Sequence, residues 1–213
     1  MNLLEKIYRS RLGEVLSIGA RLLSFFHRPW MIYGYRDPQT GEFYKFTRMS
    51  STVTIMSPRN LKLSDHVWVW HHSILDATEG IVIEEGCQIG AWVGIFTHGS
   101  ENAIRLLGRG FVHIPNRQRK GYTRGAVHIG AFTFVGASSI ILPGVRVGKG
   151  CLIGARSLVN KDIPNYSVVV GQPAKIIGST IDVDAKHFRE HDFSATYYDP
   201  EALKMIQERL QHQ

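Results

Sequence analysis

The chain has 213 residues, of which 44% are hydrophobic and 20% are charged, and its formal net charge is +7. This length suits one domain with small appendages, and the sequence contains neither an apolar run long enough to predict a membrane span nor the pattern of a secretory signal peptide. The positive charge favours anionic partners, but no nucleic-acid-binding motif accompanies it, so we expect no nucleic acid partner.

The first element predicted along the chain is a helix over residues 2–26. Its apolar residues repeat at the spacing of one broad helix face, and basic residues such as Lys6 and Arg9 occupy the other. We expect this helix to pack against the rest of the domain or a neighbouring subunit. The alternative is a peripheral contact with a membrane surface, near a lipid-linked substrate. Residues 1–50 are therefore assigned to an N-terminal helical or irregular segment.

Residues 129–164 repeat every six residues. The branched residues at one phase are Ile129, Val135, Ile141, Val147, Ile153 and Val159. A helix with 3.6 residues per turn cannot keep one face at a spacing of six, but a short strand followed by a bend can. Three hexads then close one turn of a triangular coil, in which the branched residue points inward. A glycine often follows it, and we expect this glycine to serve the bend with a positive φ.

An earlier block of the same repeat runs through Leu63, Val69, Leu75, Ile83, Ile89 and Ile95. The two blocks should stack into one all-β solenoid, a parallel β-helix over residues 51–178. Residues 98–128 interrupt the repeat, and long insertions of this kind are usually functional or disordered. Residues 179–213 are predicted to form a tail, in which Asp199-Pro200-Glu201 begins a short helix.

Five segments resemble the hexapeptide-repeat acyltransferases, and within them the bacterial sugar and polysaccharide O-acetyltransferases. They are Val127-His128-Ile129-Gly130, Ile141-Leu142-Pro143-Gly144-Val145, Ile153-Gly154-Ala155, Lys161-Asp162-Ile163-Pro164 and Val170-Gly171-Gln172-Pro173-Ala174-Lys175. Upstream, Ile74-Leu75-Asp76 and Ile95-Phe96-Thr97-His98 resemble the acceptor side of those enzymes.

The resemblance implies a left-handed β-helix and a homotrimer with active sites in the clefts between subunits. It implies an acetyl-CoA-dependent O-acetyltransferase that acetylates a hydroxyl of a sugar, or of a cell-surface polysaccharide or its precursor. The expected location is the cytoplasm or the inner face of the membrane.

A histidine suits the base that such a reaction needs, because its pKa lies near neutrality. The family places this histidine just after the last strand before the long loop, which here is His98. In many relatives it stands a few residues later, where this chain has Glu101. Glu101 is therefore a second catalytic candidate, either as the base or as a carboxylate that orients the imidazole. His113, in the same insertion, is a further candidate for the base.

The same resemblance assigns positions to both substrates. The Ala137 N–H would serve as an oxyanion donor. The residues that would line the CoA groove are Gly136, Ala137, Gly154, Ala155, Lys161 and Lys175, with the lysines toward the phosphates or adenine. The residues that would contact the acceptor are Asp76, His72 and Arg105. Arg105 belongs to a basic stretch of the insertion, whose guanidinium groups match phosphate or carboxylate oxygens.

Two other functions stay open. A γ-class carbonic anhydrase needs three histidines that converge on zinc, and His66, His71 and His98 are the available set. A non-catalytic β-helix scaffold would bind no CoA. The leading hypothesis requires no metal, and Cys87 and Cys151 predict neither a disulfide nor a zinc site.

Overall fold

The structure is a computed structural model that describes residues 7, 10–13, 15–16, 18–19 and 28–211. It divides into two compact units, Met1–Trp30 and Met31–Gln213. In the first unit residues 11–13, 15–16 and 18–19 are helical. Most of the helix expected over residues 2–26, and with it the proposed membrane contact, lies outside the described residues. No helix among those described is long and apolar enough to cross a bilayer.

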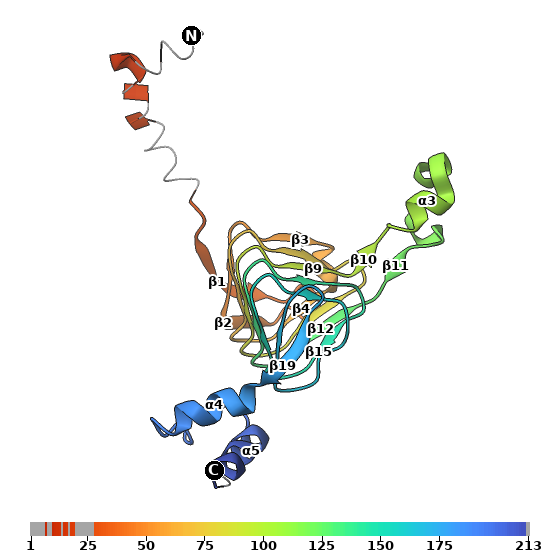
Figure 1. Ribbon diagram of the computed structural model, residues 1–213. Helices are drawn as coiled ribbons and strands as arrows, with labels where there is room; N and C mark the ends of the chain where they lie inside the picture. Colours follow the sequence, from red (N-terminus) through yellow and green to blue (C-terminus); the bar gives the residue numbers. More distant parts are fainter. Residues whose placement is uncertain (1–6, 8–9, 14, 17, 20–27, 212–213) are drawn as a thin grey trace. The chain divides into compact units, whose positions relative to one another are not determined.

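The second unit is a triangular coil with three walls, each a stack of short strands (Figure 1). Wall 1 contains β1 (Met31–Arg36), β2 (Phe43–Ser50), β5 (Trp68–Val69), β8 (Gln88–Ile89), β13 (Phe134–Val135), β16 (Leu152–Ile153), β18 (Ser167–Val170) and β19 (Lys175–Ser179). Wall 2 contains β3 (Thr54–Met56), β6 (Ile74–Asp76), β9 (Gly94–Phe96), β14 (Ile140–Ile141) and β17 (Leu158–Val159). Wall 3 contains β4 (Leu61–Leu63), β7 (Ile81–Ile83), β12 (Val127–Ile129) and β15 (Arg146–Val147).

The chain passes from wall 1 to wall 2 to wall 3 in every turn, and the walls meet at three edges. The first edge joins walls 1 and 2, the second joins walls 2 and 3, and the third joins walls 3 and 1. Strands of neighbouring turns pair in parallel, so that branched residues of the repeat lie side by side: Ile129 of β12 lies beside Ile83 of β7 and Val147 of β15. The wall strands thus realise the solenoid that the repeat predicts.

The core is the column of inward-pointing residues. All six branched residues of the later block, Ile129 to Val159, are at most 1% exposed. The smaller residues four places later are also buried, and those with hydroxyls donate hydrogen bonds to backbone carbonyls. Thr133 Oγ1, for example, lies 2.9 Å from Gly148 O. Cys87 and Cys151 are free and buried in the same column.

The glycines of the repeat have a different role from the one expected. Positive φ occurs three residues after the branched residue, at positions such as Ser138 (60°) and Arg156 (60°), and not at the glycine that follows it directly. Gly136 lies outside the left-handed region, so the expectation for it was wrong. A Cβ at Gly136 would overlap the backbone nitrogen of Ala155 in the next turn. Glycine is therefore needed there because successive turns approach closely.

Residues 31–50 differ from the irregular segment expected for residues 1–50. β1 and β2 form an antiparallel hairpin, and β2 pairs in parallel with β5, so wall 1 already begins in this segment. Asp37 holds the turn between them, since its Oδ1 accepts hydrogen bonds from the N–H groups of Gln39 (2.7 Å) and Thr40 (2.9 Å). A 3₁₀ turn, η1 (Pro58–Asn60), precedes β4.

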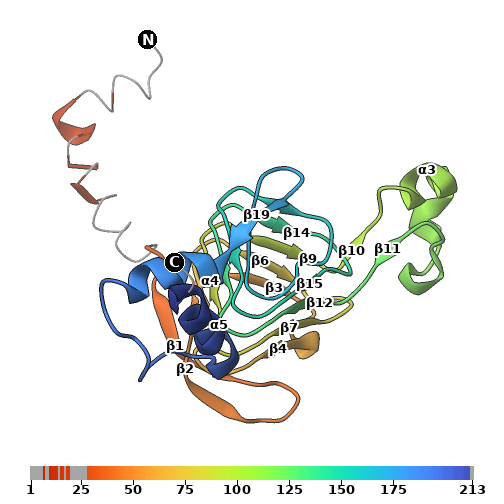
Figure 2. The ribbon, with the colours of Figure 1, turned by 60° about the horizontal axis from the view of Figure 1, so that its bottom comes forward.

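The insertion is an ordered arm that stands out from the second edge (Figures 1 and 2). Its base is an antiparallel pair, β10 (His98–Gly99) with β11 (Thr123–Arg124), and its outer part holds α3 (Ala103–Leu107), η2 (Gly108–His113) and η3 (Asn116–Gln118).

The C-terminal tail packs two helices, α4 (Thr180–Phe188) and α5 (Pro200–Gln211), around a small second core. Asp199 caps α5 by accepting a hydrogen bond from the Glu201 N–H at 2.9 Å, as its sequence signature predicts. Helix α4 was not expected from the sequence.

Candidate functional site

The edges of the coil separate the residues that the sequence singled out. His72, Gly136, Ala137, Gly154 and Ala155 follow wall 1 strands and lie along the first edge. Asp76 ends a wall 2 strand, His98 and Lys161 follow wall 2 strands, and all three lie along the second edge. Wall 2 therefore stands between the expected base and the expected CoA groove, and one chain does not bring the two together.

At the second edge, His98 lies against a buried carboxylate. Its Nδ1 is 2.6 Å from Asp76 Oδ2, and the two side chains are 27% and 1% exposed. Nδ1 is itself buried, and the contact has the distance of an ion pair rather than the angle of a regular hydrogen bond. Asp76 ends β6, and the neighbouring strand β9 ends two residues before His98, so the pairing of adjacent turns brings the two side chains together.

Asp76 is held in its ionised form by its surroundings. Burial raises the pKa of this carboxyl, but hydrogen bonds from the Thr78 hydroxyl and N–H, the attraction of His98 and a hydrogen bond from the Thr97 N–H together hold it below its usual value. The Thr78 hydroxyl lies 2.6 Å from Oδ1. Because it is almost fully buried, Asp76 is not available for the direct acceptor contact expected from the sequence.

A pocket of about 500 Å³ opens beside His98. It is lined by Phe96, His98, Gly99, Glu101, Thr123, Leu142, Pro143 and Asn160. These residues come from the second edge at three successive turns and from the base of the arm. The pocket is thus an apolar hollow with a histidine, a carboxylate and an amide in its wall.

Glu101 lines this pocket but is engaged by the arm rather than by His98. Thr123 Oγ1 donates a hydrogen bond to its carboxylate, and the Arg105 guanidinium donates to its backbone oxygen at 2.5 Å. The Thr123 hydroxyl is the main cause that lowers the pKa of Glu101. The carboxylate that contacts the His98 imidazole is that of Asp76 rather than that of Glu101.

Arg105 itself turns back on its own helix, where its guanidinium also binds Asn102 Oδ1 at 2.6 Å. It does not line the pocket beside His98.

An aromatic stack ties the arm to His98. The ring of Tyr122 lies parallel to that of His98 with centroids 6.0 Å apart, and Phe111 lies parallel to Tyr122 at 6.1 Å. Arg119 covers Phe111 and donates a hydrogen bond to the Tyr122 hydroxyl at 3.1 Å. Sequence reasoning missed Tyr122, because the arm has no repeat from which its position could be counted.

The first edge offers backbone donors rather than side-chain chemistry. Among the hydrogen bonds between described residues, none uses the N–H of Ala137 or of Ala155. Ala155 is exposed and Ala137 partly so. Lys161 and Lys175 are both exposed near the end of the coil, Lys175 at the start of β19.

His72 is exposed at the first edge and stacks on Trp92, with ring centroids 5.9 Å apart. His71 is its neighbour and contacts Ser50 Oγ at 2.7 Å. His66 lies at the third edge, 3.7 Å from Glu85. The histidines considered for zinc thus belong to three different edges and do not converge within the chain.

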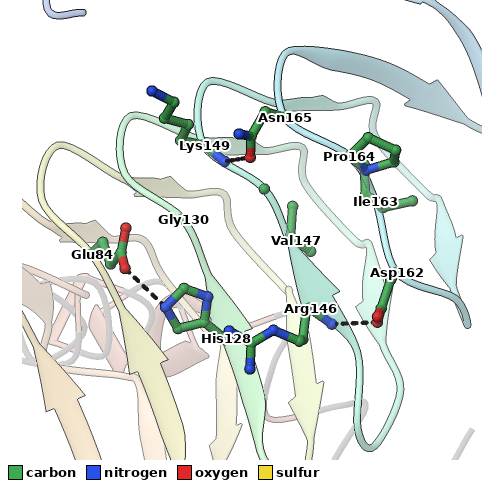
Figure 3. Close-up of a pocket in the computed structure, with 11 residues that line it drawn as sticks. Glu84, His128, Gly130, Arg146, Val147, Lys149, Asp162, Ile163, Pro164 and Asn165 are labelled. Carbon is green, nitrogen blue, oxygen red and sulfur yellow. Dashed lines mark hydrogen bonds and ion pairs between the residues drawn. The ribbon is translucent and has the colours of Figure 1, made fainter.

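A second pocket, of about 480 Å³, lies on wall 3 and the third edge (Figure 3). Its main polar pair is His128 Nε2 with Glu84 Oε1 at 2.9 Å. The Lys149 ammonium, on the rim, is neutralised by Asp199 (2.7 Å) and Glu201 (2.9 Å). It contains none of the expected site residues, and Glu84, the partner of His128, is 42% exposed whereas Asp76, the partner of His98, is 1% exposed. The second edge is therefore the candidate site.

Comparison with known proteins agrees with the hexapeptide repeat and the coil. Residues 126–161 match the family "Bacterial transferase hexapeptide (six repeats)". The chain is 46% identical over 61 residues to a candidate acetyltransferase of Staphylococcus aureus, a match that covers 28% of this chain and 31% of that protein. It is 34% identical over 125 residues to serine acetyltransferase 4 of Arabidopsis thaliana, covering 59% of this chain and 31% of that one. The chain thus spans about a third of the length of these relatives.

A variant of AntD, an N-acyltransferase of Bacillus cereus solved with dTDP and coenzyme A, has a similar structure. The TM-score is 0.50 at 20% identity, and the match covers 68% of this chain and 88% of that one. The repeat and this likeness identify the coil as a left-handed β-helix of the hexapeptide-repeat type, which confirms the resemblance seen in the sequence.

Proposed function

We propose that this hexapeptide-repeat chain is an acetyl-CoA-dependent O-acetyltransferase whose acceptor is a sugar or glycan hydroxyl. The observation that carries the proposal is the 2.6 Å contact between His98 Nδ1 and the buried Asp76 carboxylate, at the wall of a pocket on a coil of this type. The acetyltransferase relatives and the CoA-bound structural neighbour support the donor.

In the proposed reaction His98 acts as general base. Asp76 keeps a proton on Nδ1, so Nε2 is free to accept the proton of the acceptor hydroxyl as its oxygen attacks the thioester carbonyl. The imidazolium that forms is stabilised by the Asp76 carboxylate. When the tetrahedral intermediate collapses, the carbon–sulfur bond breaks and the imidazolium returns its proton to the departing thiolate. Asp76 is therefore a positioning residue, in place of the acceptor-binding role that the sequence suggested.

The CoA arm is proposed to lie along the first edge. The N–H groups of Ala137 and Ala155 have no hydrogen-bond partner among the described residues and could bind the thioester oxygen and the pantetheine amides. Lys161 and Lys175 would meet the phosphates. Gly136 and Gly154 contribute by allowing the turns to stack closely, which leaves the alanines as the groove surface.

This arrangement requires a site shared between subunits, because the two edges belong to opposite sides of wall 2. A homotrimer would supply it by placing the first edge of one subunit against the second edge of its neighbour. Wall 2 is suited to such an interface, since Ile74 and Ile140 on its outer face are 39% and 40% exposed. The reaction would take place where acetyl-CoA is available, in the cytoplasm.

Mixed trimers test the shared site. One variant carries His98→Ala and the other Ala155→Trp, which fills the CoA groove; each alone should be inactive. After the two are unfolded together and refolded, about a quarter of the sites should combine an intact His98 with an intact groove and regain activity. CoA release from acetyl-CoA with a panel of methyl glycosides is the readout. Inactive mixed trimers, formed from variants whose mass in light scattering is that of three chains, would contradict the shared site.

A further inference from the structure

The pocket beside His98 contains a carboxylate whose position depends on a glycine. Glu101 and His98 line the same pocket, and Thr123 fixes one oxygen of the carboxylate by a hydrogen bond. A Cβ at Gly99 would overlap the other oxygen, Oε2. The carboxylate therefore lies over the backbone of residue 99, in the space that any side chain there would fill.

This carboxylate keeps its charge. Among the described residues that line the pocket, Glu101 is the only one with a permanent charge. The hydrogen bond from Thr123 holds its pKa below the usual value. No ion pair between described residues neutralises it: Arg105, whose charge also lowers the pKa of Glu101, binds the Glu101 backbone oxygen and Asn102, and Arg124 pairs with Glu79.

The rest of the pocket suits a sugar ring. Phe96, Leu142 and Pro143 offer apolar surface to the C–H groups of a pyranose, and Asn160 offers an amide to its hydroxyls. A carboxylate accepts hydrogen bonds from hydroxyl or ammonium groups and repels other anions.

We propose that Glu101 is an acceptor-specificity residue, which binds a hydroxyl or amino group of the acceptor and selects uncharged or amino sugars over acidic ones. The inference rests on the acetyl transfer proposed above. The positive net charge of the whole chain, taken alone, would favour an acidic acceptor. The negative charge inside the pocket favours the opposite choice, because it lies closer to the acceptor.

Three probes test this selection with one ring in three charge states: methyl glucoside, its 6-amino-6-deoxy derivative and methyl glucuronide. The full chain should favour the first two over the glucuronide by about tenfold or more in kcat/KM, mainly through KM. Glu101→Gln should reduce this preference by about tenfold. Gly99→Ala should do the same, because the new methyl group displaces a carboxylate that is still present. Glu85→Gln, an exposed acid at the third edge, is the matched control and should leave the preference unchanged.

Ligand-observed NMR with CoA present measures the same preference as binding, so the test does not depend on turnover of these probes. Equal use or binding of the glucuronide by the unaltered chain would overturn the proposal, as would an unchanged preference in Glu101→Gln. A Gly99→Ala variant that behaves like the unaltered chain would overturn the placement of the carboxylate. Failure of the proposed function is a separate result: undiminished turnover in His98→Ala.

Discussion

Replacing Asp76 by Asn isolates the electrostatic part of the proposed mechanism. The substitution keeps the size of the side chain but removes the charge that faces His98 Nδ1 at 2.6 Å. We expect the variant to bind CoA normally, because the proposed groove residues are unchanged and the Asp76 side chain is only 1% exposed. Its kcat/KM for acetyl transfer should fall, since the imidazolium formed in the reaction loses its counter-charge.

The size of the effect follows from the geometry. At an effective dielectric constant of about 20, unit charges 2.6 Å apart attract by about 6 kcal/mol, which is an upper bound. His98 is 27% exposed, so solvent replaces part of this attraction. We therefore expect a loss of about 3–4 kcal/mol in transition-state stabilisation, which corresponds to about a 10²–10³-fold lower rate.

The assay is steady-state CoA release, with calorimetric CoA binding measured in parallel. Asp65→Asn is the matched control, because Asp65 also caps backbone N–H groups at an edge of the coil but lies away from His98. A double variant separates folding from catalysis: on a His98→Ala background, Asp76→Asn should cause little further loss. If the two losses multiply, or if Asp76→Asn alone loses less than threefold, the role given to the pair is refuted.

Two further predictions concern stability. Gly136→Ala should destabilise the coil by about 1–3 kcal/mol in urea unfolding, because its Cβ would overlap the next turn, whereas Gly110→Ala, with open space around it, should be neutral; equal midpoints would contradict the stacking role. The pKa of Asp76 lies below its ordinary 3.8, so its ionised form stabilises the fold above about pH 4, and this stabilisation is lost as the pH falls toward the folded-state pKa. The melting temperature of Asp76→Asn should therefore decline less steeply than that of the unaltered chain between about pH 4 and 2, and parallel curves would show that the charge adds nothing.

The sequence predicted the coil because its period is geometric. A spacing of six fixes which residues point inward, and the buried column from Ile129 to Val159 follows directly. The same spacing also predicts which edge each residue reaches. Residues that follow wall 2 strands fall on one edge and those that follow wall 1 strands on another, so the separation of His98 from Ala137 is implicit in the number of hexads between them.

What the sequence did not predict are contacts without a period. Asp76 was expected to face the acceptor, yet the next turn covers it and leaves its carboxylate to His98. The hairpin of β1 and β2 was missed because it precedes the first hexad, although Asp37 and Gly41 mark its turn. The hydrogen bond from Thr123 to Glu101 depends on the antiparallel pairing of the two ends of the arm. No local sequence pattern predicts this pairing.

The most direct test of the account is acetyl transfer by the unaltered chain and by His98→Ala, measured as acetylated product by mass spectrometry after incubation with acetyl-CoA and a panel of glycosides. We expect acetylated product from the unaltered chain and about 10²–10⁴-fold slower formation by His98→Ala, with unchanged affinity for CoA. Product formed equally fast by both proteins, or no affinity for CoA in either, would contradict the account.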